Sequence, residues 1–96
     1  MPYELSLQLR DLLGAVRAFK AGERDLEALQ FAVRSAEESV TEFELRALRR
    51  HLHGAEGRLE LLRFTAEGDH LFREAVSVAD EVAFRVRQAL GIAAEE

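Results

Sequence analysis

The sequence contains no cysteine, and its only proline is Pro2. Without cysteine the chain can form no disulfide bond and no thiolate metal site. Because no proline follows position 2, nothing in the interior forbids long helices. Small secreted domains usually depend on disulfides, so the absence of cysteine favours a cytoplasmic protein.

Long hydrophobic runs are missing as well. No stretch reaches the ~18 uninterrupted apolar residues that indicate a membrane-spanning helix, and no basic region followed by an apolar core opens the chain. The formal net charge is −5, which repels phosphate groups. We therefore expect no binding to DNA and no association with a membrane.

The residues that are present describe a globular protein. Apolar residues make up 48% of the chain and charged residues 32%, a balance that supports a folded core. The length of 96 residues suits one domain with a single modest core. We expect residues 1–96 to form a single helical domain.

Apolar residues recur at spacings of three and four along four segments, which predicts helices over about 4–20, 25–38, 42–65 and 70–90. Alternating strand patterns are absent. Short links between periodic helices predict an all-α antiparallel four-helix bundle. The stripes of the first, second and fourth helices are Leu5, Leu9, Leu12, Val16 and Phe19; Leu26, Leu29, Val33, Ala36 and Val40; and Phe72, Val76, Ala79, Ala83, Val86 and Leu90.

Several helix ends carry capping signals. Gly22 and Gly91 follow the first and fourth stripes and suit left-handed C-terminal caps. Asp25 is a good N-cap for the second helix. Thr41 and Glu44 have the spacing of a capping box, which predicts the start of the third helix.

The boundaries on either side of the third predicted helix are less sharply marked. One unbroken helix from Asp25 to Phe64 is an alternative, because neither glycine nor proline separates the second and third segments. The leucine stripe restarts at Leu45 out of register with Val40, which favours a tight turn. Farther along, Gly68 and Asp69 are expected to break the third helix and cap the fourth.

The third helix carries two apolar stripes that are centred roughly 165° apart. The first stripe contains Leu45, Leu48, Leu52, Ala55, Leu59 and Leu62. The second contains Phe43, Ala47, Gly54, Gly57, Leu61 and Phe64, with Arg50 as its one polar interruption. A surface helix needs one buried face, so the second stripe requires another cover.

Two packing partners are possible for the second stripe. Another helix of the same chain can lie over it, or the same stripe of a second copy can pack against it in a homodimer. Because so short a chain has few helices to spare, we favour the dimer. Among the aromatic residues, Phe19 and Phe72 are expected in the core, whereas Phe31 and Phe84 lie off the stripes of their helices.

The segment from Arg46 to His51 has an arginine, four residues and then a histidine. This spacing resembles the signature of HEPN-type ribonucleases, small all-helical proteins that pair to build a site at the dimer interface. The resemblance covers six residues and departs from the family's usual polar residue at Ala47. It implies a metal-independent ribonuclease, in which His51 moves the proton of the attacking hydroxyl and Arg46 stabilises the phosphorane charge.

Some polar residues have the spacing of metal ligands. Two pairs at helical spacing, Glu56 with Glu60 and His70 with Glu74, together would supply four ligands. The Glu-x-x-His spacing that is typical of di-iron bundles occurs only once, at Glu67 and His70. A basic patch is formed by Arg46, Arg49, Arg50 and His53, which share one solvent-facing arc and suit either an acidic partner or pairing with nearby carboxylates.

These patterns favour a small non-enzymatic interaction module that self-associates as a dimer and binds a protein partner. Its interface is expected at Phe43, Ala47, Gly54, Gly57, Leu61 and Phe64. A dimeric ribonuclease using Arg46 and His51 is the alternative, and a metal-binding bundle ranks third. No cofactor is indicated.

Overall fold

The computed structural model describes residues 2–91 and consists of four α-helices joined by short turns. The helices are α1 (Tyr3–Lys20), α2 (Leu26–Ser39), α3 (Arg46–Thr65) and α4 (Gly68–Leu90), and a short 3-10 helix, η1 (Phe43–Leu45), precedes α3. The predicted all-α four-helix bundle is confirmed. The break between the second and third helices is also confirmed, so the single helix from Asp25 to Phe64 does not form.

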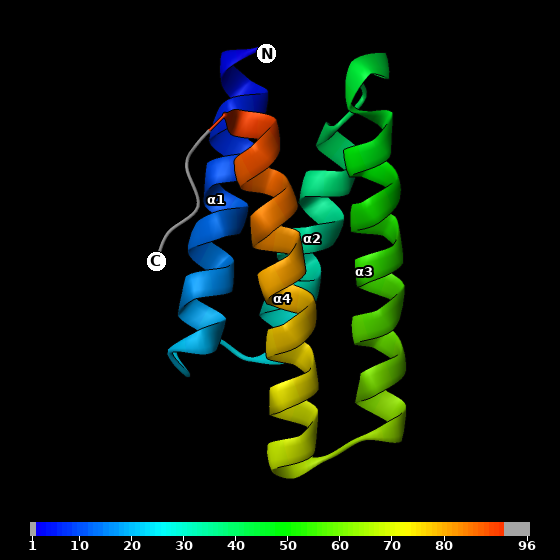
Figure 1. Ribbon diagram of the computed structural model, residues 1–96. Helices are drawn as coiled ribbons and strands as arrows, with labels where there is room; N and C mark the ends of the chain where they lie inside the picture. Colours follow the sequence, from blue (N-terminus) through cyan, green and yellow to red (C-terminus); the bar gives the residue numbers. More distant parts are fainter. Residues whose placement is uncertain (1, 92–96) are drawn as a thin grey trace.

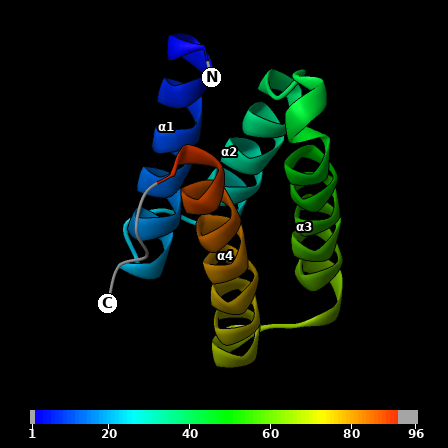
Figure 2. The same ribbon diagram turned by 45° about the horizontal axis from the view of Figure 1, so that its top comes forward.

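Successive helices run in opposite directions, and their contacts close into a ring (Figure 1). α1 packs on α2, α2 on α3, α3 on α4, and α4 returns to α1. Figure 2 shows the same four helices from a tilted direction, with α4 between α1 and α3 at the front. This ring leaves one side of every helix facing outward.

The core lies along the axis of the bundle and is formed by the main stripe of each helix. In α3 the inward residues are Leu48, Leu52, Ala55 and Leu59, all buried, as the first stripe predicts. Leu45 and Leu62 pack against the edge of the core. The other buried residues of this hydrophobic cluster are Leu5, Leu9, Leu12, Val16, Phe19, Leu29, Val33, Ala36, Val40, Ala75, Val78, Ala79, Val82, Ala83 and Val86.

The turn between α1 and α2 has the predicted caps. Gly22 has a φ of +79°, and its backbone N–H donates to the carbonyl of Phe19. The N–H of Glu23 donates to the carbonyl of Ala18 at 2.8 Å, which completes a Schellman motif. Asp25 then caps α2, because its side chain accepts a hydrogen bond from the N–H of Ala28 at 2.9 Å. Gly91 ends α4 with a φ of +74°, also as predicted.

The capping predictions for α3 and α4 are wrong. No side-chain hydrogen bond caps η1 or α3, so Thr41 and Glu44 do not form a capping box. The turn begins at Glu42, whose carbonyl accepts from the N–H of Leu45 at 3.0 Å, and Thr41 therefore lies outside it. α4 begins at Gly68, so Asp69 lies in its first turn rather than at its cap.

Phe72 is not a core residue, which corrects the expectation from its stripe. Its side chain is 42% exposed, although its ring lies 5.3 Å from that of the buried Phe19. α4 has 23 residues and α1 has 18, and α4 extends beyond the lower end of α1 in Figure 1. Phe72 therefore packs against the end of α1 and has no helix covering its outer side.

Within residues 2–91, no helix is long and apolar enough to cross a membrane.

Candidate functional site: the outer face of α3

The second stripe of α3 faces away from the bundle. We call it the outer face; it comprises Phe43, Ala47, Gly54, Gly57, Leu61 and Phe64, and every one of these residues is exposed. The exposed fractions of Phe43, Leu61 and Phe64 are 71%, 61% and 76%. No helix within residues 2–91 covers this face, so the structure does not have the first of the two expected covers.

The two glycines of the outer face look onto open space. A Cβ added at Gly54 or Gly57 would meet no atom within 4 Å. Each glycine destabilises a helix interior by about 1 kcal/mol relative to alanine. Packing does not offset this cost, because within residues 2–91 no other backbone lies close to either glycine.

On its α2 side, the outer face is bordered by polar contacts. The guanidinium of Arg34 lies 2.9 Å from the carboxylate of Glu56, and Nδ1 of His53 lies 3.0 Å from Glu37. Farther along, Arg63 pairs with Glu27 at 3.0 Å. Arg63 also donates a hydrogen bond to the side-chain oxygen of the buried Gln30 at 3.2 Å. The side-chain amide of Gln30 in turn donates to the carboxylate of Glu60 at 2.8 Å. These contacts hold α3 against α2 and occupy the polar groups beside the outer face.

On its α4 side, the outer face is bordered by Arg58 and His51. Arg58 donates to the carboxylate of Glu81 at 2.8 Å, and this contact holds the pKa of Glu81 below its usual value. His51 is partly buried, and its Nε2 has no hydrogen-bond partner. Burial, followed by the charges of Arg85 and Arg58, lowers the pKa of the His51 imidazole. These effects favour the neutral form of the imidazole.

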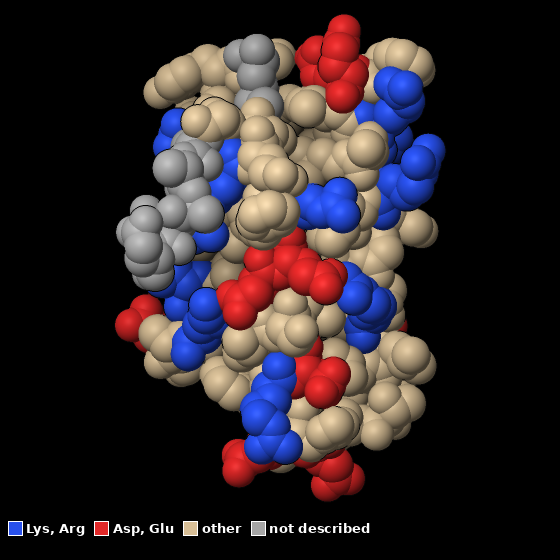
Figure 3. Space-filling view, viewed as in Figure 1, with Lys and Arg blue, Asp and Glu red and all other residues tan. Residues whose placement is uncertain are grey.

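The N-terminal end of the outer face carries the basic patch. The guanidinium of Arg46 stacks 4.0 Å from the centre of the Phe43 ring and donates to the Phe43 carbonyl. Arg49 and Arg50 are exposed and form no ion pair within residues 2–91. Figure 3 shows arginine side chains, in blue, gathered along the upper part of α3. Of the four residues of the patch, only His53 contacts a carboxylate, and that carboxylate, Glu37, belongs to α2 and not to the same helix.

The two residues of the ribonuclease alternative face different surroundings. Arg46 is engaged by Phe43, whereas His51 lines a hollow with residues of α4. A single chain therefore does not bring the guanidinium and the imidazole to one site. Ribonuclease activity at a dimer interface stays a prediction.

The four-ligand metal cluster does not form in the described part of the chain. Glu56 pairs with Arg34, and Glu60 with Arg63 and Gln30. Residues 2–91 contain no group of three or more His, Cys, Asp or Glu side chains that could hold a metal ion.

The exposed aromatic residues do not form one surface. Phe31 lines a hollow between α1 and α2, and Phe84 lines one between α3 and α4. Only Phe43 and Phe64 belong to the outer face, and they lie at its two ends, about 30 Å apart at the rise of an α-helix.

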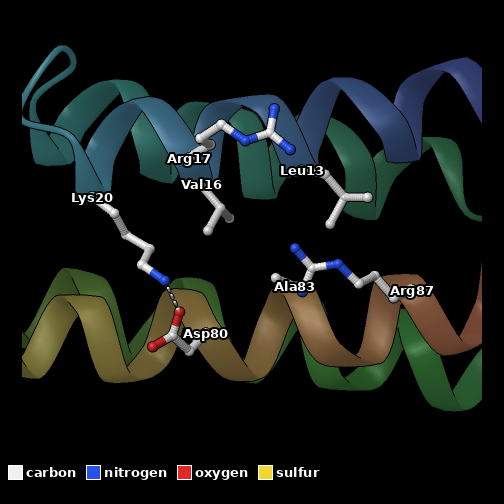
Figure 4. Close-up of a pocket in the computed structure, with 7 residues that line it drawn as sticks. All are labelled: Leu13, Val16, Arg17, Lys20, Asp80, Ala83 and Arg87. Atoms are coloured by element: carbon white, nitrogen blue, oxygen red, sulfur yellow. Dashed lines mark hydrogen bonds and ion pairs between the residues drawn. The ribbon is translucent and has the colours of Figure 1, made fainter. Parts of the chain in front are cut away.

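One feature was missed from the sequence: a groove between α1 and α4 that is lined by charged side chains (Figure 4). Its charged residues are Arg17, Lys20, Asp80 and Arg87. The available signal was that Arg17 and Arg87 flank the apolar stripes of their helices. These positions indicate a shared groove only when α1 and α4 are known to be neighbours.

Comparison with protein-family models, with curated proteins and with solved structures gives no match to this chain.

Proposed function

We propose that this protein is a non-enzymatic interaction module that self-associates through the outer face of α3 and presents the dimer to a protein partner. The observation that supports the proposal is the exposure of Leu61 and Phe64 beside two glycines that no part of the chain approaches. Apolar surface of this kind is stabilised when a second surface removes it from water.

The spacing of the outer face suits a second helix. With Arg50 included, its residues follow one another at alternating steps of four and three, the repeat with which two helices pack along a shared seam. Glycine and alanine near the middle allow two backbones to approach closely. A two-fold axis lets the same surface serve both copies.

Arg50 favours an antiparallel arrangement of the two α3 helices. In a parallel pair at equal register, Arg50 would face its own copy, and the like charges would repel. In an antiparallel pair with Gly54 opposite Gly57, Arg50 lies opposite Leu61 and Phe64 lies opposite Ala47. That register places Phe64 against a smaller side chain and Leu61 against the apolar stem of the arginine, while Phe43 lies beyond the paired part of α3.

The basic patch supplies a second surface next to this seam. Arg49 projects beside the seam from an acidic protein and forms no ion pair within residues 2–91, so an acidic segment of a partner protein would find complementary charge there. We place the module in the cytoplasm because it has no cysteine.

The proposal is tested by the molar mass in solution of Leu61→Lys. We expect the unmodified chain to have the mass of a dimer by light scattering at tens of micromolar, and Leu61→Lys to have the mass of a monomer. In the dimer the ammonium group would be buried opposite Arg50 of the other copy, and the like charges would repel, whereas in the monomer it stays in water. Helical circular dichroism should remain unchanged.

Leu7→Lys provides the matched control. Leu7 is an exposed leucine on α1, away from the outer face, and the same substitution there should leave the dimer intact. A monomeric unmodified chain at tens of micromolar, or equal dissociation by Leu7→Lys and Leu61→Lys, would overturn the proposal. An RNA-cleavage assay of the unmodified chain and of His51→Ala decides the enzymatic alternative.

A further inference from the structure

The groove between α1 and α4 carries more positive charge than its own residues neutralise. Arg17 and Lys20 line it from α1, and Asp80 and Arg87 line it from α4. Nζ of Lys20 lies 2.7 Å from the Asp80 carboxylate, so this pair is internally balanced. Neither Arg17 nor Arg87 forms an ion pair within residues 2–91. The groove therefore has an excess of two positive charges on a protein whose net charge is −5.

The two arginines also extend along the same section of the groove. Figure 4 shows the Arg17 guanidinium extending along α1 toward Leu13, and the Arg87 guanidinium extending back along α4 toward Ala83. Each side chain thus points away from the C-terminal end of its own helix. Basic residues in a last helical turn often stabilise the terminal carbonyls, but these two guanidiniums do not lie in that direction.

The shape of the groove limits what can enter it. Leu13, Val16 and Ala83 form its floor, and the hollow measures about 230 Å³. Pockets for drug-sized ligands measure roughly 300–1,000 Å³, so this hollow suits a smaller group. The acidic surface elsewhere repels long polyanions such as nucleic acids. The fitting ligand is therefore a small anion.

We propose that this groove binds the phosphate group of a small molecule through Arg17, Arg87 and Lys20. A phosphate dianion matches the excess of two charges, whereas a carboxylate carries only one. Guanidinium groups bind phosphate oxygens through paired, charge-assisted hydrogen bonds, and two of them can hold different oxygens of one phosphate. Inorganic phosphate and a small phosphomonoester share this chemistry, and the experiment below distinguishes them.

A second hollow, between α3 and α4, shows why the charge balance matters. It is lined by Arg58 and Arg85, but also by the carboxylates of Asp80 and Glu81. Arg58 is already paired with Glu81 at 2.8 Å. Figure 3 shows the acidic side chains gathered near the middle of the α4 surface. Because Asp80 is already paired with Lys20, only Arg85 is left unneutralised in this hollow, a smaller excess of charge than in the groove between α1 and α4.

The proposal is tested by NMR titration of the arginine Nε–H signals at constant ionic strength. Inorganic phosphate, methyl phosphate and acetate are the three probes, each added up to 20 mM at pH 7.5. We expect both phosphates to shift the Arg17 and Arg87 signals with saturation, and acetate to bind at least about tenfold more weakly. The tighter of the two phosphates identifies the free anion or the ester as the preferred form.

Substitutions of single arginines test whether phosphate binds at Arg17 and Arg87. Arg17→Gln and Arg87→Gln should each weaken phosphate binding at least about tenfold, because each removes one paired contact. Arg73→Gln is the matched control, since Arg73 is an exposed arginine of α4 outside the groove, and it should bind as the unmodified chain does. Circular dichroism checks that all three variants fold.

Two further measurements separate a binding site from a merely structural cluster. Asp80→Asn removes the one carboxylate of the groove, and we expect it to strengthen phosphate binding severalfold. Binding of methyl phosphate should weaken between pH 7.5 and pH 5.5, because its second ionisation has a pKa near 6 and the arginines stay charged. Absence of saturable shifts, binding of acetate as tight as that of phosphate, or equal loss in Arg73→Gln would each overturn the proposal.

Discussion

The inner and outer faces of α3 have similar apolar periodicity and opposite surroundings. Leu52 and Leu59 on the inner face are fully buried, whereas Leu61 on the outer face is 61% exposed. The inner face contains leucine almost throughout, while the outer face has glycine and alanine at its centre and aromatic rings at its ends. Periodicity therefore indicates which residues share a side of a helix. Burial is decided by what packs there.

The largest expected difference between the two faces is tested by one substitution made on each. Leu52→Ala should lower the free energy of unfolding by about 2–5 kcal/mol, because it leaves a cavity in the core. Leu61→Ala should change it by less than about 0.5 kcal/mol when the chain is monomeric. Urea unfolding at submicromolar concentration measures both values, and a large loss in Leu61→Ala would mean that the outer face is packed within the chain.

A smaller effect of opposite sign is expected from the glycines. Gly54→Ala and Gly57→Ala should each stabilise the monomer by about 1 kcal/mol, since alanine is the better helix former and the added Cβ meets open space. The same methyl groups should weaken self-association by preventing close backbone approach. Thermal unfolding at low concentration and light scattering at high concentration test the two halves of this prediction. Unchanged dimerisation would show that the helices do not cross at the glycines.

Arg50→Leu sharpens the comparison by making the outer face uniformly apolar. In the antiparallel arrangement Arg50 lies opposite Leu61, so its replacement should strengthen the dimer only severalfold. A parallel dimer would gain far more, because two facing charges would be removed from the seam. Sedimentation equilibrium of Arg50→Leu measures the dissociation constant, and a gain above about a hundredfold, or nearly 3 kcal/mol, would contradict the antiparallel register.

The smallest expected effect concerns His51, at the border between α3 and α4. Its folded-state pKa lies below the ordinary value of about 6.5, because burial and nearby arginines oppose protonation. The unfolded chain therefore binds this proton more readily, and stability falls as the pH drops through 6.5 toward the folded-state pKa. Urea unfolding at pH 7.5 and 5.5 should show a larger loss in the unmodified chain than in His51→Gln. Equal losses would show that His51 does not contribute.

The four helices were predictable because each carries a regular stripe, and because glycine or aspartate marks several of their ends. Asp25 and Gly22 act locally, so their roles follow from the residues around them. Thr41 failed as a cap because the turn begins one residue later, a shift of backbone geometry that the side chains do not encode. Phe72 was misplaced because its burial depends on where α1 ends.

The candidate sites could also be predicted only in part from the sequence. Membership of the outer face followed from helical geometry alone, and its exposure required the whole bundle. The groove at Arg17 and Arg87 could not be predicted, since these residues are far apart in the sequence and meet only because α4 returns to α1. Local patterns identify the faces of helices, whereas topology decides which faces meet.

The ring of helix contacts also has a consequence for the order of folding. Three of its four contacts join helices that are neighbours in the chain, and only the contact between α1 and α4 joins its two ends. Neighbouring helices close short loops and form early, so we expect folding in milliseconds or less. Closing α1 onto α4 requires the longest loop. It should be the last contact to form, and anything that bridges Arg17 and Arg87 would slow its reopening.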